Sequence, residues 1–264
     1  MDKKAFVACV LGVLAAVTVP TAPARAAEPD PVLALLSDKG WSGTRITYGF
    51  PGAGFRWEYS TAFTSGFVPA DDTEKALFRE ALREWAAASG GAVSFVETGP
   101  RSAQVRLGVT RSSLGTKPNG DPYRGWTYYP GSSARAGDVW LQAGLRTLGY
   151  ADGKKGGWVV RHEIGHALGL KHPHAGTPTL PVDLDCAEHT VMTYRTYCGD
   201  PAPGGWPDTR RSYPYALGDL DGRAVRLVYA PSASTQAEGS ISTRQPDQPR
   251  QPVRPQHDAP RGQE

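Results

Sequence analysis

The sequence predicts one α+β domain in residues 27–230 of this 264-residue chain, and three observations lead to that class. Several short runs alternate apolar or aromatic residues with polar ones, which is the period of half-buried strands. Three other segments space their apolar residues as amphipathic helices do. Hydrophobic residues make up 39% of the chain and aromatic residues 9%, enough to build a core and too many for a wholly disordered protein.

Six short runs predict the strands of one sheet, because alternating side chains point to opposite faces of a strand. The runs are Ile46–Phe50, Phe55–Tyr59, Val93–Val96, Val105–Val109, Trp126–Tyr129 and Val139–Leu141. The first helix is predicted to begin at Asp71, where Glu74 completes a capping box, and to end at Gly90–Gly91. Two further helices are predicted, one from Trp158 to Leu168 and one from Asp219 to Tyr229.

The two ends of the chain are predicted to lie outside this domain. Residues 1–26 have the pattern of a secretory signal peptide: basic residues precede an apolar run of about 15 residues, short of a membrane span, and Ala24–Ala26 offers small residues for cleavage. In residues 231–264, proline recurs at every third position from Pro246 to Pro255, which predicts a disordered Pro/Gln-rich tail. The protein is therefore expected to be secreted, without stable membrane insertion.

The charge balance argues against nucleic acid as a partner. The chain has 29 Lys+Arg against 26 Asp+Glu, and part of this excess lies in residues 1–26. A nearly neutral mature chain lacks the basic surface that nucleic acids or anionic membranes require.

The cysteines indicate one disulfide. Cys9 lies in the predicted signal peptide, so the mature chain would keep only Cys186 and Cys198. In an oxidising compartment these two are expected to pair, and closing so short a loop would stabilise the fold by roughly 2–3 kcal/mol. Two free or metal-binding thiols are the alternative.

The residues that indicate chemistry are concentrated in the segment RHEIGHALGLKH of the second predicted helix. His162 and His166 are four residues apart, so one helical turn places both imidazoles within reach of one cation. Gly169 would let the chain leave the helix in a left-handed turn, which can bring His172 back as a third ligand. Three imidazoles with one open position describe a catalytic zinc site, because structural sites fill all four positions. A solvated helix face is the alternative for the two-histidine pattern alone, and the added glycine and third histidine argue against it.

A second motif follows the histidines. Met192 lies in the stretch Thr190–Tyr194, inside the loop that the cysteine pair would close. Such a methionine is ordinarily a core residue, yet a His-Glu-x-x-His-x-x-Gly-x-x-His helix followed by a methionine turn is the metzincin signature. The chain thus resembles the catalytic domain of the serralysin-like metzincins, and more distantly the astacins and matrixins. The resemblance implies a zincin fold: a twisted, mixed, mostly parallel sheet with a zinc-binding active-site helix and a Met-turn at Met192.

The resemblance extends over most of residues 32–230. Trp41–Thr44 is similar to the start of a serralysin catalytic domain, Gly137–Leu141 to the strand before its zinc helix, and Asp221–Tyr229 to its closing helix. The chain departs from that family in its Pro/Gln-rich tail, which replaces glycine- and aspartate-rich calcium repeats. No histidine precedes the zinc motif, so the structural zinc site of matrixins has no ligands.

One catalytic zinc ion, held by His162, His166 and His172, is the cofactor that the sequence implies; calcium could also bind, but no pattern identifies its ligands. Glu163 is expected to act as general base on the attacking water and then to return the proton to the leaving amine. By the resemblance, Tyr194 is expected to be a fifth zinc ligand or a transition-state stabiliser. A core tyrosine is the alternative.

Substrate is expected to bind as an extended peptide that adds to an exposed strand edge as an antiparallel partner. Gly125–Pro130 is the predicted edge, since a proline ends pairing. Trp126, Thr127 and Tyr128 are therefore the candidate substrate-binding residues. An ordinary surface hairpin without a bound peptide is the alternative.

Together these features predict a secreted zinc metalloendopeptidase that acts on peptides or proteins, with a monomer as the default state. The main alternative is a secreted binding or inhibitory module that keeps zinc for structure, although such a site has no use for Glu163. A third hypothesis is a zinc hydrolase that acts on an amide outside proteins, such as one in a cell wall. His174 and His189 are expected to be loop histidines, with His174 a reserve ligand.

Overall fold

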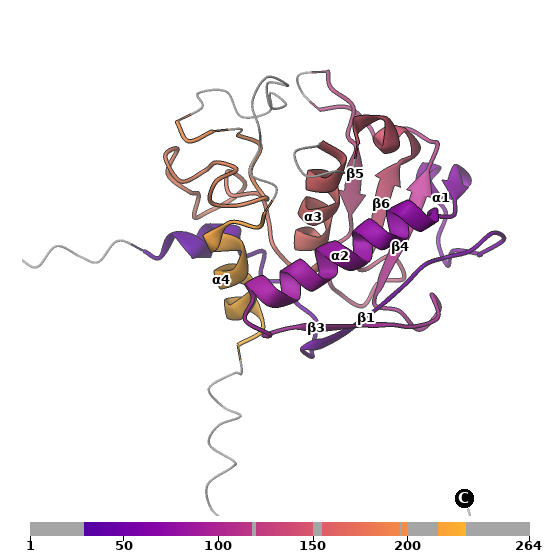
Figure 1. Ribbon diagram of the computed structural model, residues 1–264, viewed down its shortest axis with the longest axis horizontal. Coiled ribbons are helices and arrows are strands. Elements are labelled where there is room, and N and C mark those ends of the chain that lie inside the picture. The colour runs from indigo at the N-terminus through magenta and orange to yellow at the C-terminus, as the bar shows by residue number, and fades with distance from the viewer. Residues whose placement is uncertain (1–28, 118–119, 150–154, 196, 200–215, 231–264) are drawn as a thin grey trace, which may run out of the picture. The chain divides into compact units, whose positions relative to one another are not determined.

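The computed structural model of the chain describes residues 29–117, 120–149, 155–195, 197–199 and 216–230. The predicted signal peptide and the predicted tail lie outside these ranges. Among the described residues, no helix has both the length and the hydropathy that a bilayer crossing requires. In chain order the elements (Figure 1) are η1 (Pro31–Leu35), β1 (Arg45–Gly49), α1 (Ala62–Ser65), β2 (Phe67–Val68), α2 (Asp72–Ala88), β3 (Ser94–Glu97), β4 (Val105–Thr110), β5 (Gly125–Thr127), β6 (Asp138–Gln142), η2 (Ala143–Leu148), α3 (Lys155–Ala167) and α4 (Asp219–Val228).

The strands form one sheet in the order β3-β1-β4-β6-β5, with β2 paired to β4 off this path. β1 is parallel to β3 and to β4, and β4 is parallel to β6. β2 and β5 are antiparallel to their neighbours. The expected mixed, mostly parallel sheet is therefore confirmed. β5 ends the order, so its outer edge meets no other strand in the described part of the chain.

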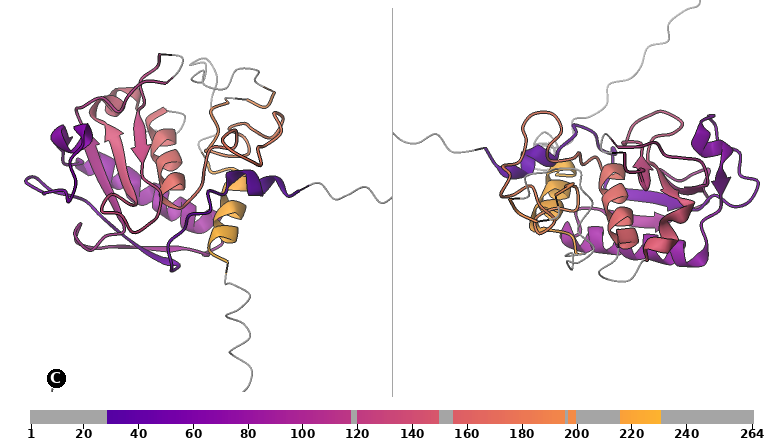
Figure 2. Two further views of the ribbon diagram at one scale, coloured as in Figure 1. Left: turned by 180° about the vertical axis from the view of Figure 1, so that it is seen from behind. Right: turned by 90° about the horizontal axis from the view of Figure 1, so that it is seen from above.

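One face of the sheet packs against α2 and α3 (Figures 1 and 2). The register pairs Leu107 of β4 with Val139 of β6, so both side chains point to that face. Both are fully buried in one hydrophobic cluster with Phe78 of α2 and Ile164 of α3. The two helices and the sheet therefore share a single core, which fixes α3 relative to the strands.

Helix α2 begins as the sequence predicts. The Asp71 side chain accepts a hydrogen bond from the Glu74 backbone N–H at 2.8 Å, and the Glu74 carboxylate accepts one from the Asp71 N–H at 2.9 Å. Near its other end, α2 is tied to α3 by two contacts. The Trp85 indole N–H donates to the Arg161 carbonyl at 3.1 Å, and the Arg161 guanidinium donates to both carboxylate oxygens of Glu84. These bonds hold the histidine-bearing helix against α2.

The predicted strand at Phe55–Tyr59 is wrong, because this segment covers the sheet instead of joining it. The Trp57 ring lies 4.5 Å from the Trp140 ring, on the face of the sheet away from the buried Val139. The Tyr59 hydroxyl donates to the Asp138 carboxylate at 2.7 Å. The aromatic alternation that resembles a strand is thus a set of rings packed over β6.

The other five predicted strands each overlap an observed one, with ends that differ by at most two residues. Four short elements were not predicted at all: η1, α1, β2 and η2. Each is too short to show a periodic pattern, since β2 has two residues and α1 has four.

Candidate metal centre and catalytic cleft

Three imidazoles converge where α3 ends. His162 and His166 lie one turn apart on α3, and His172 follows the helix. The Nε2 atom of His172 lies 3.1 Å from Nε2 of His162 and 3.0 Å from Nε2 of His166. Each of the three histidines offers one ring nitrogen as a ligand atom, and these three nitrogens all lie within 4.8 Å of one another. The arrangement brings together the three histidines that the sequence singles out.

The opposite ring nitrogens fix the tautomers. Nδ1 of His162 lies 2.7 Å from the Val191 carbonyl oxygen, and Nδ1 of His166 lies 2.7 Å from the Leu170 carbonyl oxygen. Because a carbonyl can only accept, both Nδ1 atoms carry the proton and both Nε2 atoms present a lone pair. Lone pairs that face a third nitrogen at this distance favour a cation between them, and such carbonyl partners typically orient metal-binding histidines.

The donor set fits zinc. Two nitrogens bound to one tetrahedral zinc at 2.0–2.1 Å are about 3.3 Å apart, close to the separations found here. Burial lowers the pKa of His166 to about 4, and burial together with the neighbouring imidazoles lowers the pKa of His162 and His172 well below 6.5. All three rings are therefore neutral, which is the form that binds a metal ion.

Gly169 brings His172 back to the helix. Its φ of 97° lies in the left-handed region, and a side chain there would collide with the Lys39 carbonyl oxygen. The turn also places the Leu170 carbonyl against Nδ1 of His166. One glycine therefore positions a third imidazole and orients a second.

The Glu163 carboxylate lies outside the group of three and lines the same cleft. It is buried, and one of its oxygens accepts a hydrogen bond from the Thr127 hydroxyl at 2.7 Å. Gly125 lies so close that any side chain there would collide with the carboxylate. Burial raises the pKa of Glu163 to about 8, against the opposing effects of the Thr127 hydrogen bond and the positive charge of Lys117.

A cleft of about 270 Å³ runs over the imidazoles and Glu163, beside the free edge of β5. The Tyr128 N–H donates to the Asp138 carbonyl, and the register pairs Trp126 with β6 in the same way. Since backbone groups alternate along an antiparallel strand, the N–H and C=O groups of Gly125 and Thr127 point away from β6. Both residues line the cleft, so these groups are positioned to pair with an extended peptide.

The three predicted substrate-binding residues are placed differently from one another. Thr127 lines the cleft and bonds Glu163. Trp126 also lines it and is 39% exposed. Tyr128 is not part of the lining and packs its ring 6.5 Å from that of Trp126. Tyr129 lines the cleft instead, with its ring 5.5 Å from that of His166. The alternation that places Thr127 in the cleft also places Tyr129 there, so the strand pattern could have identified it.

Met192 is fully buried beneath α3. Its sulfur occupies the space beside Gly165, where any side chain would collide with it. The chain turns at Val191 and Met192, and the Met192 N–H donates to the Thr190 hydroxyl at 3.0 Å. The glycine inside the histidine motif therefore makes room for the methionine below the imidazoles.

Asp221 of α4 holds this turn in place. Its carboxylate accepts hydrogen bonds from the Thr190 hydroxyl at 2.6 Å, the Val191 N–H at 2.9 Å and the Gly218 N–H at 2.8 Å. Burial raises the pKa of Asp221 to about 7, although these hydrogen bonds act in the opposite direction. Because the Val191 carbonyl faces His162, Asp221 orients a histidine that it does not touch.

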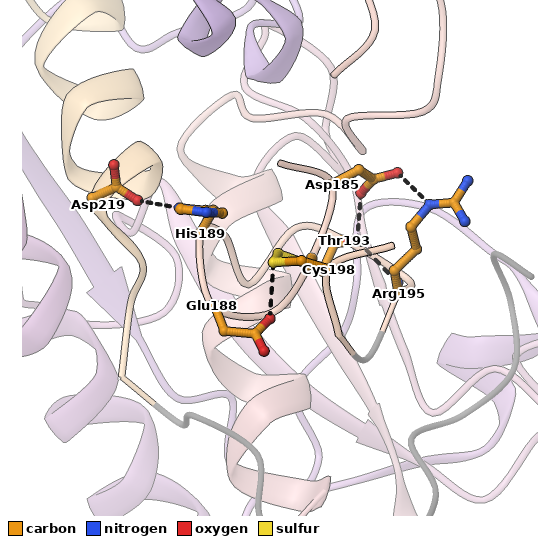
Figure 3. Close-up of a disulfide and its surroundings, with 8 residues drawn as sticks. Asp185, Glu188, His189, Thr193, Arg195, Cys198 and Asp219 are labelled. Carbon is orange, nitrogen blue, oxygen red and sulfur yellow. Dashed lines mark hydrogen bonds and ion pairs between the residues drawn. A yellow bond between two sulfur atoms is a disulfide. The ribbon is translucent and has the colours of Figure 1, made fainter. Parts of the chain in front are cut away.

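The Tyr194 ring packs against the imidazoles, 4.4 Å from the His172 ring. Its burial raises its pKa above the usual value, so the hydroxyl keeps its hydrogen. The residues on both sides of Tyr194 are clamped by one buried carboxylate (Figure 3): Asp185 accepts from the Thr193 hydroxyl at 2.5 Å and from Nε of Arg195 at 3.1 Å.

A disulfide joins Cys186 to Cys198 beside this clamp (Figure 3). The loop that it closes contains Met192 and Tyr194, so the bond and the Asp185 clamp act on the same segment. Cys186 and Cys198 also lie near His189, but sulfurs that are bonded to each other are not metal ligands.

The two other described histidines lie outside the group of three. The His174 ring stacks on His172, with 5.3 Å between ring centroids. Nδ1 of His189 lies 2.9 Å from the Asp219 carboxylate (Figure 3). Neither contributes to the converging nitrogens.

Several further side chains of the cleft were not predicted, Trp158 and Lys117 among them. The Trp158 ring lies 4.9 Å from that of His162, one turn earlier on α3, so helical spacing could have placed it. The Lys117 ammonium group lies 4.5 Å from the centre of the Tyr194 ring. Lys117 belongs to a loop, where no periodic pattern could have identified it.

Two curated proteins from Dickeya chrysanthemi are similar to this chain. Serralysin A is 30% identical over 213 residues, which cover 76% of this chain and 43% of serralysin A. Serralysin C is 29% identical over 221 residues, with the same two shares. The chain therefore spans less than half the length of these relatives. No protein-family model matches it.

Proposed function

We propose that this chain, which carries a serralysin-like metzincin catalytic domain, is a zinc-dependent metalloendopeptidase that hydrolyses peptide bonds in proteins. One observation carries the proposal. Two Nε2 lone pairs, each fixed by an Nδ1–H bond to a carbonyl, meet a third imidazole beside a buried carboxylate. A site that used zinc only for structure would need no such carboxylate.

His162, His166 and His172 would hold the zinc ion, which makes α3 the zinc-binding helix and Thr190–Tyr194 the Met-turn. When bound, zinc would supply Lewis acidity, which polarises a peptide carbonyl. The same Lewis acidity would lower the pKa of water, so that the water can lose a proton and attack the carbonyl near neutral pH. The carbonyls of Val191 and Leu170 keep the imidazoles in the binding tautomer.

Glu163 is the proposed general base. Its carboxylate would take a proton from the attacking water while the water oxygen bonds to the carbonyl carbon. It would then give that proton to the nitrogen as the carbon–nitrogen bond breaks, so the products are a carboxylic acid and an amine. The Thr127 hydroxyl holds one oxygen of the carboxylate in place during both transfers.

Tyr194 is proposed to stabilise the transition state. Its hydroxyl would donate to the carbonyl oxygen as negative charge builds there, or serve as a fifth ligand in the resting enzyme. The neighbouring Asp185 clamp would limit how far the ring can move.

An extended peptide is the proposed substrate, because the outward backbone groups of Gly125 and Thr127 can pair with an added strand. We further propose that residues 1–26 are a signal peptide, that the protein is secreted and acts as a monomer, and that residues 231–264 form a tail outside the catalytic domain.

Peptide hydrolysis with and without a chelator tests the proposal. The purified protein should digest casein, lose that activity in 1,10-phenanthroline and regain it when zinc is added after the chelator is removed. Phenylmethylsulfonyl fluoride, which blocks serine nucleophiles, is the matched control and should have no effect. Activity that survives metal removal would contradict the zinc mechanism.

A further inference from the structure

We propose that four side chains at the disulfide form a second metal site when that bond is reduced, and that the site takes a thiophilic divalent cation such as Zn²⁺. A sulfur of each cysteine and a ring nitrogen of His189 lie within 4.8 Å of one another. One oxygen of the Glu188 carboxylate lies 3.5 Å from Sγ of Cys198. Figure 3 shows this carboxylate and the His189 ring beside the disulfide. The four proposed ligands are therefore Cys186, Glu188, His189 and Cys198, none of which lines the cleft.

This donor set fits a tetrahedral zinc ion. Zinc binds thiolates at about 2.3 Å and imidazole or carboxylate atoms at about 2.0–2.2 Å, which places a sulfur and an oxygen about 3.6 Å apart. The separation of Cys198 Sγ from the Glu188 carboxylate is close to that value. Thiolates favour zinc over magnesium and calcium, which prefer oxygen ligands. Because side chains fill all four positions, the ion would serve structure, unlike an ion on the three histidines of the cleft.

Asp219 orients His189 for this role. Its carboxylate lies 2.9 Å from Nδ1 of His189, so Nδ1 carries the proton and Nε2 keeps the lone pair that a metal ion needs. Metal-binding histidines typically have such a partner, which fixes the ring and makes the other nitrogen more basic. The Leu220 N–H also donates to the His189 carbonyl at 3.1 Å, so α4 holds this residue at its backbone as well.

Backbone hydrogen bonds hold the two cysteines together independently of the bond between their sulfurs. The His189 N–H donates to the Cys186 carbonyl at 3.0 Å, which closes the turn that carries both ligands. The Gly199 N–H donates to the Val182 carbonyl at 3.2 Å, which keeps Cys198 beside that turn. Reduction therefore leaves two thiols close to the His189 ring.

A phosphine is a reductant that can open the site. Cys198 is exposed and Cys186 is fully buried, so phosphorus attacks the sulfur of Cys198 and Cys186 leaves as a thiolate. Water then displaces the Cys198 sulfur from phosphorus. The phosphine becomes its oxide with the oxygen of that water, and the two protons convert both sulfurs to thiols. Zinc binding releases these two protons, because thiolates are the ligands.

Metal counting before and after reduction tests the proposal. The full chain is stripped of metal, treated with tris(2-carboxyethyl)phosphine or left oxidised, and dialysed against zinc without oxygen. In the oxidised protein the sulfurs stay bonded to each other and bind no metal, so the reduced protein should hold one more zinc ion per chain. Cobalt in place of zinc should give sulfur-to-cobalt charge-transfer absorption in the reduced protein alone. An equal metal count, or cobalt spectra without this absorption, would overturn the proposal.

Variants identify the ligands by the affinity of the reduced protein for cobalt, followed by the same absorption. Asp219→Ala frees the His189 ring and should weaken binding about tenfold, whereas His189→Ala removes a ligand and should weaken it about 100-fold or more. Asp72→Ala is the matched control, because Asp72 is the first residue of α2 as Asp219 is of α4, and it should leave the affinity unchanged.

An affinity that His189→Ala does not alter would mean that the two thiols bind the metal alone, and would overturn the site. Neither readout depends on peptide hydrolysis. The result therefore decides this proposal whether or not the chain is a peptidase.

Discussion

The two histidines of α3 and the third, His172, reach the same point by different means. His162 and His166 are positioned by helical geometry, since four residues of helix bring both rings to one face. His172, Met192 and Tyr194 lie in irregular chain after the helix, where individual contacts replace periodic geometry: the left-handed turn at Gly169, the Asp221 and Asp185 carboxylates and one disulfide.

In the irregular segment, hydrogen bonds to buried carboxylates position the side chains, as backbone geometry does in the helix. Asp221 accepts three hydrogen bonds around one turn, and Asp185 bonds the residues on both sides of Tyr194. Substitutions on the helix should therefore affect chemistry directly. Substitutions of the two carboxylates should affect it through the position of the loop.

The largest effect is expected on the helix. Glu163→Gln keeps the size of the side chain and its contact with Thr127 but removes the base, so kcat should fall by about 10³-fold or more. Zinc content, measured by atomic absorption, should stay at the wild-type level. Near-normal turnover would remove Glu163 from its proposed role, and loss of zinc would mean that it supports the metal instead.

The next effect is expected at Asp221, as a loss of stability. Asp221→Ala leaves buried N–H groups of Val191 and Gly218 without acceptors, which should lower the free energy of unfolding by about 1–3 kcal/mol for each. Denaturant unfolding of the zinc-loaded protein measures the loss. Asp221→Asn is the control, since its amide oxygen can still accept both N–H bonds while the Thr190 hydroxyl turns. If Ala and Asn behaved alike, the carboxylate would not be holding the turn.

A smaller effect is expected at Asp185. Asp185→Ala removes the carboxylate that bonds both Thr193 and Arg195. Tyr194 should then be held less well, and kcat should fall about tenfold, with KM and zinc content little changed. Peptide kinetics measure both constants. The same substitution in a Tyr194→Phe background should have little further effect on kcat. An undiminished effect there would show that Asp185 acts by another route.

The last prediction concerns the pH dependence of stability. The pKa of Asp221 is raised from 3.8 to about 7 in the fold, so between these values the folded chain binds more protons than the unfolded chain. The contribution of this residue to stability is therefore full below pH 4 and falls as the pH rises toward 7, by at most about 1.4 kcal/mol per pH unit. The free energy of unfolding of Asp221→Asn, measured between pH 4 and 7, should fall less steeply with pH than that of the wild-type protein. Identical pH dependence in both proteins would contradict the shifted pKa.

The same contrast explains what the sequence could predict. Periodic segments were predicted well: α2 with its capping box, α3 with its two histidines and most strands of the mixed sheet. The aromatic run at Phe55–Tyr59 was wrongly predicted as a strand. Alternation shows only which side chains are buried, and a segment that packs its rings on the sheet gives the same pattern as a strand within it.

The hydrogen bonds by which Asp185 and Asp221 hold the loop could not be predicted, because they join residues that no local pattern connects. Asp185 precedes Thr193 by eight residues, and Asp221 follows Val191 by 30. Lys117 reaches Tyr194 from a loop 77 residues earlier in the chain. Such contacts depend on tertiary packing, so the histidine motif was identifiable from the sequence and the residues that orient its imidazoles were not.

Zinc K-edge X-ray absorption of the zinc-loaded protein tests the central claim most directly. Three histidine nitrogens and at least one further light donor should surround the metal at about 2.0–2.2 Å, and His166→Ala should lose the bound ion. Sulfur at about 2.3 Å would place zinc instead on Cys186 and Cys198 beside His189, and would contradict the account.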